Sequence, residues 1–295
     1  MTNATTDLCL RAKPGESLTL EEMRRSLPAI FAEQPHESRS ARYVYISTED
    51  MLERLMAADF LPVEARVSRS RDESRRPFAK HMLRLRGRDE LLRPDNTSAS
   101  DGVAFEVIMR NACDGTGSYQ MLAGLIRFAC ENGMVVSDGT VAQLKVLHTG
   151  SAQRVMDQVV ASATTVLEQG PRVADKIRAW RGIELDDGEG LLLARAAHKA
   201  RFGDEPTTPV QPEQLLLPRR PSDMGRDLWR VGNVIQENII RGGLTATVEK
   251  NGRREQRTTR AIRGIDQDVS LNRTLWALME QVAAVKERGL SYEAA

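Results

Sequence analysis

Residues 111–119, "NACDGTGSY", combine the residue types of a reactive loop. Two glycines and Asp114 stand beside Cys113, a combination that could cradle a phosphate or expose a thiolate. The segment lacks the Gly-Lys-Ser/Thr ending of a P-loop and does not fit GxGxxG. Because it follows the apolar run 103–112, we interpret it as a tight turn in which Asp114 caps and the glycines supply positive φ. Cys113 and Cys130 are interpreted as buried structural residues.

The other residues that could do chemistry are scattered along the chain. None of the four histidines lies in HxH, HExxH or HxxxH spacing, so we expect neither a metal site nor a cofactor; they are His36, His81, His148 and His198. A GxSxG elbow is also absent. The sequence therefore favours a protein that is not an enzyme.

Two acidic clusters could still hold a divalent ion. In "ELDDGEG", Asp186 and Asp187 are interpreted as an acidic loop and helix cap. Asp266 and Asp268 precede a predicted helix, where they would stabilise its N-terminus. The catalytic alternative is that Asp266, Asp268 and the nearby arginines act with a metal on a phosphoester.

The strongest chemical signal is arginine. The formal net charge is only +1, yet residues 66–88 hold eight arginines and one lysine against two acids, and residues 250–263 hold six basic residues against Glu255. Arginine forks match phosphate oxygens, and their binding releases counterions. The alternative is two solvated surface loops. We predict nucleic-acid contacts at Arg66, Arg69, Arg71, Arg75, Arg76, Lys80, Arg84 and Arg86, and at Arg253, Arg254, Arg257, Arg260 and Arg263.

Composition excludes several protein classes. No run of about 18 uncharged apolar residues occurs, so a membrane span is not expected. The first residues lack a signal-peptide core. The three cysteines include no CxxC pair, which indicates a reducing compartment. We predict a cytoplasmic protein.

The elements that would position these residues begin with a strand at 42–47, a helix after it, and a strand at 103–112. Alternating apolar and charged residues on both sides of the loop "RDESRRP" predict a half-buried hairpin. This hairpin would place Arg66, Arg84 and Arg86 on or near one exposed sheet face. For the run after residue 117, helical spacing and two short strands are both compatible with the pattern.

The second half of the chain is predicted to be mainly helical. The run 151–180 is interrupted at Gly170-Pro171, so it is two helices or one kinked helix. Later helices flank a hairpin or loop around Asn251-Gly252. We divide the chain into a flexible N-terminus (1–16), an α+β core domain (17–202), a Pro-rich linker (203–223) and a helical C-terminal module (224–288).

Four segments together resemble the phage- and plasmid-associated family catalogued as domain of unknown function 932: 80–87, 111–136, 233–243 and 259–276. The resemblance covers roughly 27–285. Family members often carry Ser and His where this chain has Ala112 and Cys113, so any chemistry of that His would not extend to this protein. The matching motif positions are Asn111, Asp114, Gly115, Tyr119, Gly124, Arg127, Cys130, Asn132 and Gly133.

The resemblance implies a protein of a mobile genetic element. By analogy with single-strand annealing recombinases, it suggests an α+β fold in which a curved antiparallel sheet packs on a long helix, joined by a C-terminal helical module with a hairpin. The expected function is nucleic-acid binding, with single-stranded DNA annealed in recombination by a homo-oligomer. Only 4% of residues are aromatic, which leaves few stacking platforms. The alternative is a non-enzymatic protein-interaction factor or a factor that inhibits host defence.

Overall fold

The computed structural model describes residues 9–38, 45–70, 72–92, 102–114, 119–128, 132–136, 144–146, 151–203, 210–250 and 253–293. The chain forms two compact units, Met1–Gly170 and Pro171–Ala295. We call them the sheet unit and the helical unit and describe each by itself. The division falls after Gly170, whereas the sequence predicted a linker at 203–223. The reason is that the helix at 187–202 packs against the later helices Leu228–Arg241 and Ile265–Glu293.

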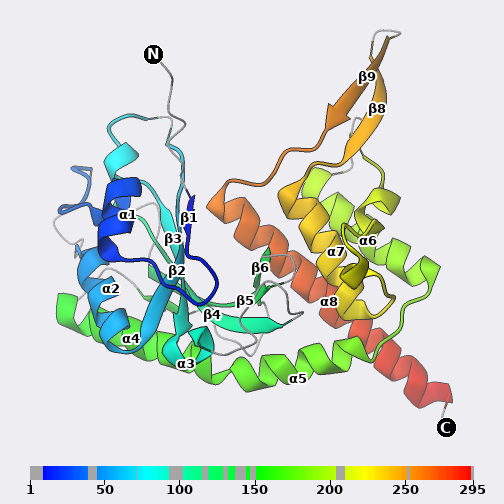
Figure 1. The fold of residues 1–295 in the computed structure, drawn as a ribbon, viewed down its shortest axis with the longest axis horizontal. Helices are drawn as coiled ribbons and strands as arrows, with labels where there is room; N and C mark the ends of the chain where they lie inside the picture. The colour runs from blue at the N-terminus through cyan, green and yellow to red at the C-terminus, as the bar shows by residue number, and fades with distance from the viewer. Residues whose placement is uncertain are drawn as a thin grey trace. The chain divides into compact units, whose positions relative to one another are not determined.

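The sheet unit is built on one antiparallel sheet that curls into a half-barrel (Figure 1). Strands β1 to β6 follow one another in space as in sequence, and β7 pairs with β5. The predicted α+β class with a curved antiparallel sheet is confirmed. The strands are β1 (Cys9–Arg11), β2 (Phe60–Val67), β3 (His81–Gly87), β4 (Val103–Asn111), β5 (Tyr119–Arg127), β6 (Asn132–Val135) and β7 (Leu144–Val146).

Helices cover one face of this sheet. The long helix α4 (Ala152–Glu168) contacts β4 and β5, and α2 (Thr48–Ala57) contacts β2. Ser47 and Ser151 cap the two helices, and α4 buries a valine and alanine stripe at 3–4-residue spacing. The unit also contains α1 (Leu20–Ser26), α3 (Arg88–Leu91) and 3-10 turns at Pro28–Phe31 and Arg76–Phe78.

The alternation of side chains gives the sheet two different faces. Leu83, Leu85 and Val107 point to the helix-covered face. Their neighbours Arg84 and Glu106 point to the opposite face, together with Glu64 on β2. One face is therefore an ordinary apolar core, and the other carries charge.

The helical unit packs around three tryptophans. The ring centroid of Trp180 lies 4.6 Å from that of Trp276 and 6.4 Å from that of Trp229. In order, its elements are α5 (Gly170–Arg181), α6 (Asp187–Phe202), 3-10 turns at Pro212–Leu216 and Pro221–Asp223, α7 (Leu228–Arg241), β8 (Thr245–Lys250), β9 (Arg253–Thr258) and α8 (Ile265–Glu293). The predicted hairpin in this part of the chain is present as β8 and β9.

Several local expectations are settled by the structure. The run after residue 117 forms strands β5 and β6, so the two-strand alternative is the one adopted. The segment 111–119 therefore connects a strand to a strand, because β4 and β5 pair directly, and residues 115–118 of the predicted turn lie outside the described residues. Of the predicted strand 42–47, residues 42–44 lie outside the described residues, and Tyr45–Ser47 is not a strand. Among the described helices, none is long and apolar enough to cross a membrane.

Candidate functional site

The charged face of the sheet is organised around one buried carboxylate. Glu106 on β4 is fully buried and accepts hydrogen bonds from Arg84 Nε and Arg86 Nε on β3, the latter at 2.8 Å. Burial acts to raise the pKa of Glu106, but attraction to Arg84 and Arg86 outweighs it and leaves the pKa below its ordinary value. The two arginines and the carboxylate form a buried ion triad.

Two glycines make room for the Arg84 guanidinium. Arg84 Nη2 donates to the main-chain oxygens of Leu125 at 2.9 Å and Met134 at 3.3 Å, which ties β3 to β5 and β6. A Cβ atom on Gly133 would lie 2.3 Å from Arg84 Nη1, and one on Gly124 would lie 3.0 Å from Arg84 Nη2. The close approach of the guanidinium therefore requires glycine at position 133. At Gly124 an added Cβ would lie still closer to Ile108 Cδ1, at 2.6 Å.

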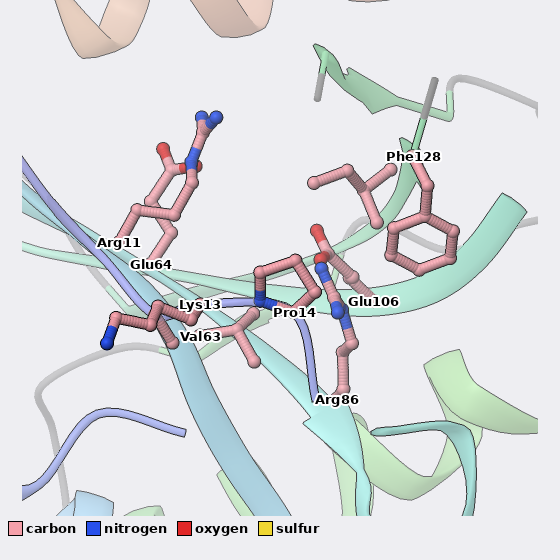
Figure 2. Close-up of a pocket in the computed structure, with 10 residues that line it drawn as sticks. Arg11, Lys13, Pro14, Val63, Glu64, Arg86, Glu106 and Phe128 are labelled. Atoms are coloured by element: carbon pink, nitrogen blue, oxygen red, sulfur yellow. The ribbon is translucent and has the colours of Figure 1, made fainter. Parts of the chain in front are cut away.

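A small pocket opens beside the triad (Figure 2). Its volume is about 40 Å³, room for about three water molecules. Arg11 donates to Glu64 Oε2 from Nε at 3.0 Å and from Nη2 at 2.7 Å, and the Arg86 guanidinium lies 5.2 Å from the centroid of the Phe128 ring. Each carboxylate in the pocket is thus engaged by an arginine of the same chain.

The prediction of an exposed arginine face on this hairpin is wrong. Arg84 and Arg86 are only 3% and 6% exposed, and Arg66 is half-buried, with its Nε 3.9 Å from Glu64 Oε1. These arginines lie on the sheet face that also carries Glu64 and Glu106, and that face is buried as well. A sequence signal for the triad existed: Glu106 is the only charged residue within the otherwise apolar run "VAFEVIM", in a strand that pairs with "LRLR".

A second buried polar cluster lies on the helix-covered face. The Thr48 hydroxyl lies 2.9 Å from His81 Nε2 and accepts from Asn111 Nδ2 at 3.2 Å, while His81 Nδ1 lies 3.2 Å from the Ala79 oxygen. Burial lowers the pKa of His81 to about 4. Burial also raises the pKa of the Cys113 thiol to about 11, against a smaller opposing effect of the hydrogen bond with Thr48. Cys113 is therefore a buried neutral thiol, as the sequence analysis predicted.

The first basic run reaches the surface in the loop between β2 and β3. Arg69 and Arg76 are exposed and Arg75 is half-buried, whereas Arg71 lies outside the described residues. Arg75 Nε lies 3.4 Å from an oxygen of Asp72, and Arg76 Nη1 lies 3.1 Å from Glu73. These pairs with Asp72 and Glu73 are weak and can exchange for other anions. Arg75 Nη1 also lies 4.0 Å from Oδ2 of the buried Asp114. Lys80, at the end of the loop, is half-buried.

The second basic run lies on and just after a two-stranded ribbon. We call residues 245–258 the arm; β8 and β9 extend beyond the helices of their own unit in Figure 1. The side chains of Arg254, Arg257, Arg260 and Arg263 are exposed. Arg253 begins β9, and its side chain lies outside what the structure describes. The arginines of this run are therefore exposed wherever their side chains are described.

The acidic clusters serve the helical unit. Asp186 caps α6 in a capping box with Glu189, whose carboxylate accepts from Lys286 Nζ at 2.8 Å. Asp268 is buried and accepts from Asn272 Nδ2 at 2.7 Å, whereas Asp266 is exposed. Among the described residues, no group of three or more His, Cys, Asp or Glu is placed to hold a metal ion.

Comparison with known proteins identifies the family. The sequence model of the family described as "Domain of unknown function (DUF932)" matches residues 35–276. This chain belongs to the DUF932 family. It is similar to the UPF0380 proteins YafZ and YfjQ of Escherichia coli (strain K12), each 42% identical over 263 residues, which is 89% of this chain and 90% of each relative. No solved structure matches.

In this DUF932 protein, the residues of the predicted family motif have distinct structural roles. Gly124 and Gly133 surround Arg84, and Asn111 belongs to the cluster with His81. Asp114 and Arg127 are buried. Tyr119 begins β5, Asn132 begins β6, and Gly115 and Cys130 lie outside the described residues. The resemblance therefore rests largely on residues that build the sheet unit.

Proposed function

We propose that this protein binds nucleic acid, with exposed arginines of the arm and of the β2–β3 loop contacting phosphates. The observation that carries the proposal is the exposure of Arg254, Arg257, Arg260 and Arg263 along one short segment. Residues 245–263 contain six basic residues and two acids. Such a density of guanidinium groups on a protruding element favours a polyanionic partner.

The β2–β3 loop adds a second set of guanidinium groups. Arg69, Arg75 and Arg76 gather within eight residues, and the acids beside them, Asp72 and Glu73, are themselves exposed. An exposed ion pair contributes about 0–1 kcal/mol, so a phosphate can replace the carboxylate at little cost. Release of counterions from the nucleic acid would supply the driving force.

Single-strand annealing, which the family analogy suggested, has less support. It would use an open basic sheet face and aromatic platforms for the bases. Arg84 and Arg86 are occupied by Glu106, and Phe78, beside the loop, packs edge-to-face against His36 with ring centroids 5.3 Å apart. We therefore propose phosphate-backbone binding and leave annealing in recombination as an outcome of the test.

No comparable observation supports the two alternatives, a protein-interaction or inhibitory factor and a metal-dependent phosphoesterase. Asp186 caps α6 and Glu189 pairs with Lys286, so two of the acids that a nucleic-acid mimic would display are engaged within the unit. The pair of Asp187 with Arg226 is exposed and weak. Asp266 and Asp268 lie two apart on α8 and do not face one another. A metal-dependent phosphoesterase site is therefore not proposed there.

The test is fluorescence anisotropy with full-length protein and single- or double-stranded oligonucleotides across a salt titration, with light scattering on the same samples. We expect affinity to fall steeply with salt. Replacing Arg254, Arg257 and Arg260 by Ala should weaken binding to all sequences and reduce the slope of log K against log salt by about 2–3. Annealing would require an oligomer that prefers single strands.

A charge-matched control separates the arm from general electrostatics. Arg172, Arg195 and Arg288 are exposed on helices α5, α6 and α8, and their replacement by Ala removes the same net charge. We expect this triple variant to keep most of the affinity and slope of the unmodified protein. An absence of binding at about 50 mM salt, or equal losses in both triple variants, would contradict the proposal.

A further inference from the structure

The arm has two chemically different faces. In an antiparallel ribbon, directly opposed residues point to the same side. Thr245 pairs with Thr258, with hydroxyl oxygens 3.1 Å apart, and Thr247 pairs with Gln256. Arg254 lies two residues from Gln256 and points to the same side, so hydroxyl, amide and guanidinium groups share one exposed face. We call Thr245, Thr247, Arg254, Gln256 and Thr258 the threonine face. Glu249 is paired with Arg254 and belongs to the same side, but its side chain lies outside what the structure describes.

The base of the arm is held rigidly. Gly243 N donates to the Thr259 oxygen and Thr259 N to the Leu244 oxygen, each at 2.8 Å. Gly242 has φ of +65°, and a Cβ there would lie 2.7 Å from the main chain of Arg260. This position therefore requires glycine for both its conformation and the close approach.

Side chains from the preceding elements fix the same base. Gln214 Nε2 donates to the Thr245 oxygen at 3.1 Å, Arg219 donates to the Gly242 oxygen, and Arg201 Nη2 donates to the Arg260 oxygen at 2.8 Å. Hydrogen bonds from other elements of the helical unit therefore fix the main chain at the base of the arm. Beyond these contacts, every described side chain of the arm is exposed except that of Ala246, which is half-buried.

The composition of the exposed arm indicates what kind of partner it would bind. An isolated two-stranded ribbon is marginally stable in water, so packing on a surface would stabilise it. The described side chains of the arm are mainly Thr, Gln, Arg and Glu. This composition rules out a partner with an apolar docking surface. A partner with dense hydrogen-bonding groups and negative charge matches this composition.

We infer that the arm enters the major groove of double-stranded nucleic acid with its threonine face toward the base edges. This inference rests on the proposed nucleic-acid binding, and it adds that the nucleic acid is double-stranded and is contacted in its major groove. The major groove of B-DNA, about 12 Å wide, admits a two-stranded ribbon. A six-residue strand is about 20 Å long, which corresponds to about six base pairs.

The chemistry of the face suits base recognition. Gln side chains pair with adenine N6 and N7, Arg with guanine O6 and N7, and Thr contacts either base edges or the thymine methyl. Gln256 and Arg254 occupy one strand, and Thr247 lies across from Gln256. Arg260 and Arg263 follow the arm at its base, where they are placed to contact flanking phosphates.

The first experiment selects sites from a random duplex pool with full-length protein. We expect enrichment of a short site of about six base pairs. The variant Thr247→Ala/Gln256→Ala should lose about fivefold to a hundredfold in preference for that site over a scrambled duplex, with an unchanged salt slope, because it removes no charge. The control Thr274→Ala/Gln281→Ala removes the same groups from the exposed side of α8 and should keep the preference.

A change in the nucleic acid tests the inference without altering the protein. Replacing the purines of the selected site by 7-deazapurines removes the N7 acceptors of the major groove and keeps the base pairs. We expect affinity for the site to fall by a similar factor. Unchanged affinity on 7-deaza duplexes would overturn major-groove entry, even if the arm variant folded poorly.

The remaining outcomes separate the two proposals. Salt-sensitive binding without any site preference, or with equal affinity for single strands, would overturn the inference and leave the proposed function standing. No binding to any oligonucleotide at low salt would overturn both. Loss of preference in the arm variant together with loss on 7-deaza duplexes would support both.

Discussion

Arginines on β3 and on β9 look alike in the sequence and end in opposite environments. Arg84 and Arg86 alternate with leucines and are buried against Glu106, whereas Arg254 and Arg257 are exposed on the arm. The difference is in the neighbours: β3 has a strand on each side within a curled sheet, and β9 pairs only with β8. Burial of an arginine is decided by the element into which its strand is built.

The two environments imply different energetics. A buried ion triad must keep every member paired, because removal of one partner leaves an uncompensated charge in a medium that solvates it poorly. An exposed guanidinium is solvated in any case, so its loss costs the folded state little. The first group is therefore expected to matter for stability and the second for binding.

The largest effect is expected from Arg84→Ala. The change removes one partner of Glu106 and the hydrogen bonds to the Leu125 and Met134 oxygens, so the free energy of unfolding should fall by about 3–5 kcal/mol. Denaturant titration followed by circular dichroism measures this. Arg257→Ala is the matched exposed control. If Arg84→Ala lowers the free energy of unfolding by less than about 1 kcal/mol, the buried arginine is no more important for stability than an exposed one, which contradicts the prediction.

The second effect concerns pH and the buried cluster on the other face. The folded-state pKa of His81 is about 4, below its unfolded value of 6.5. Between these two pH values, His81 is protonated in the unfolded state and neutral in the folded state. Stability should be complete above pH 6.5 and should fall by about 1.4 kcal/mol per pH unit toward pH 4, about 3 kcal/mol in all.

Unfolding titrations at pH 7, 6 and 5 test this with His81→Gln as the comparison. The variant should lose most of the slope in this window. The lowered pKa of Glu106 removes stability only as pH falls below its unfolded value of 4.5, so it contributes little above pH 5. Equal slopes in the two proteins would show that His81 is not the group that titrates.

A third, smaller effect is expected at Gly133. Its added Cβ would meet a guanidinium that is fixed by Glu106 and two main-chain oxygens, so Gly133→Ala should destabilise the protein by about 1–3 kcal/mol. Gly190, in α6, has open space where a Cβ would be placed. Gly190→Ala should be neutral or stabilising, by up to about 1 kcal/mol. Thermal unfolding of both variants makes the comparison.

The smallest stability effect is expected on the arm. Arg254→Ala with Arg257→Ala should change the free energy of unfolding by less than about 0.5 kcal/mol, while affinity for nucleic acid at low salt falls. Denaturation and anisotropy on the same preparation measure both quantities. Strong destabilisation without any change in affinity would reverse the roles assigned to the two groups of arginines.

Much of the fold could be predicted from the sequence. Alternation identified the β2–β3 hairpin, and the helical run 151–180 with its interruption at Gly170-Pro171 identified α4 and α5. Both signals are local, because the side-chain period of a strand or helix and the residues that cap a helix can be recognised from residues adjacent in the sequence. The choice between helix and strand after residue 117 could not be made locally, since pairing with β4 decided it.

Sequence alone determined the family, the antiparallel α+β pattern, the buried state of Cys113 and the exposed basic run after Asn251. Only the tertiary structure decided that Arg84 and Arg86 are internal and that the arm stands apart from its unit's helices. Alternation states that neighbouring side chains point to opposite faces, but the solvent exposure of a face depends on how the sheet curls and on what packs against it.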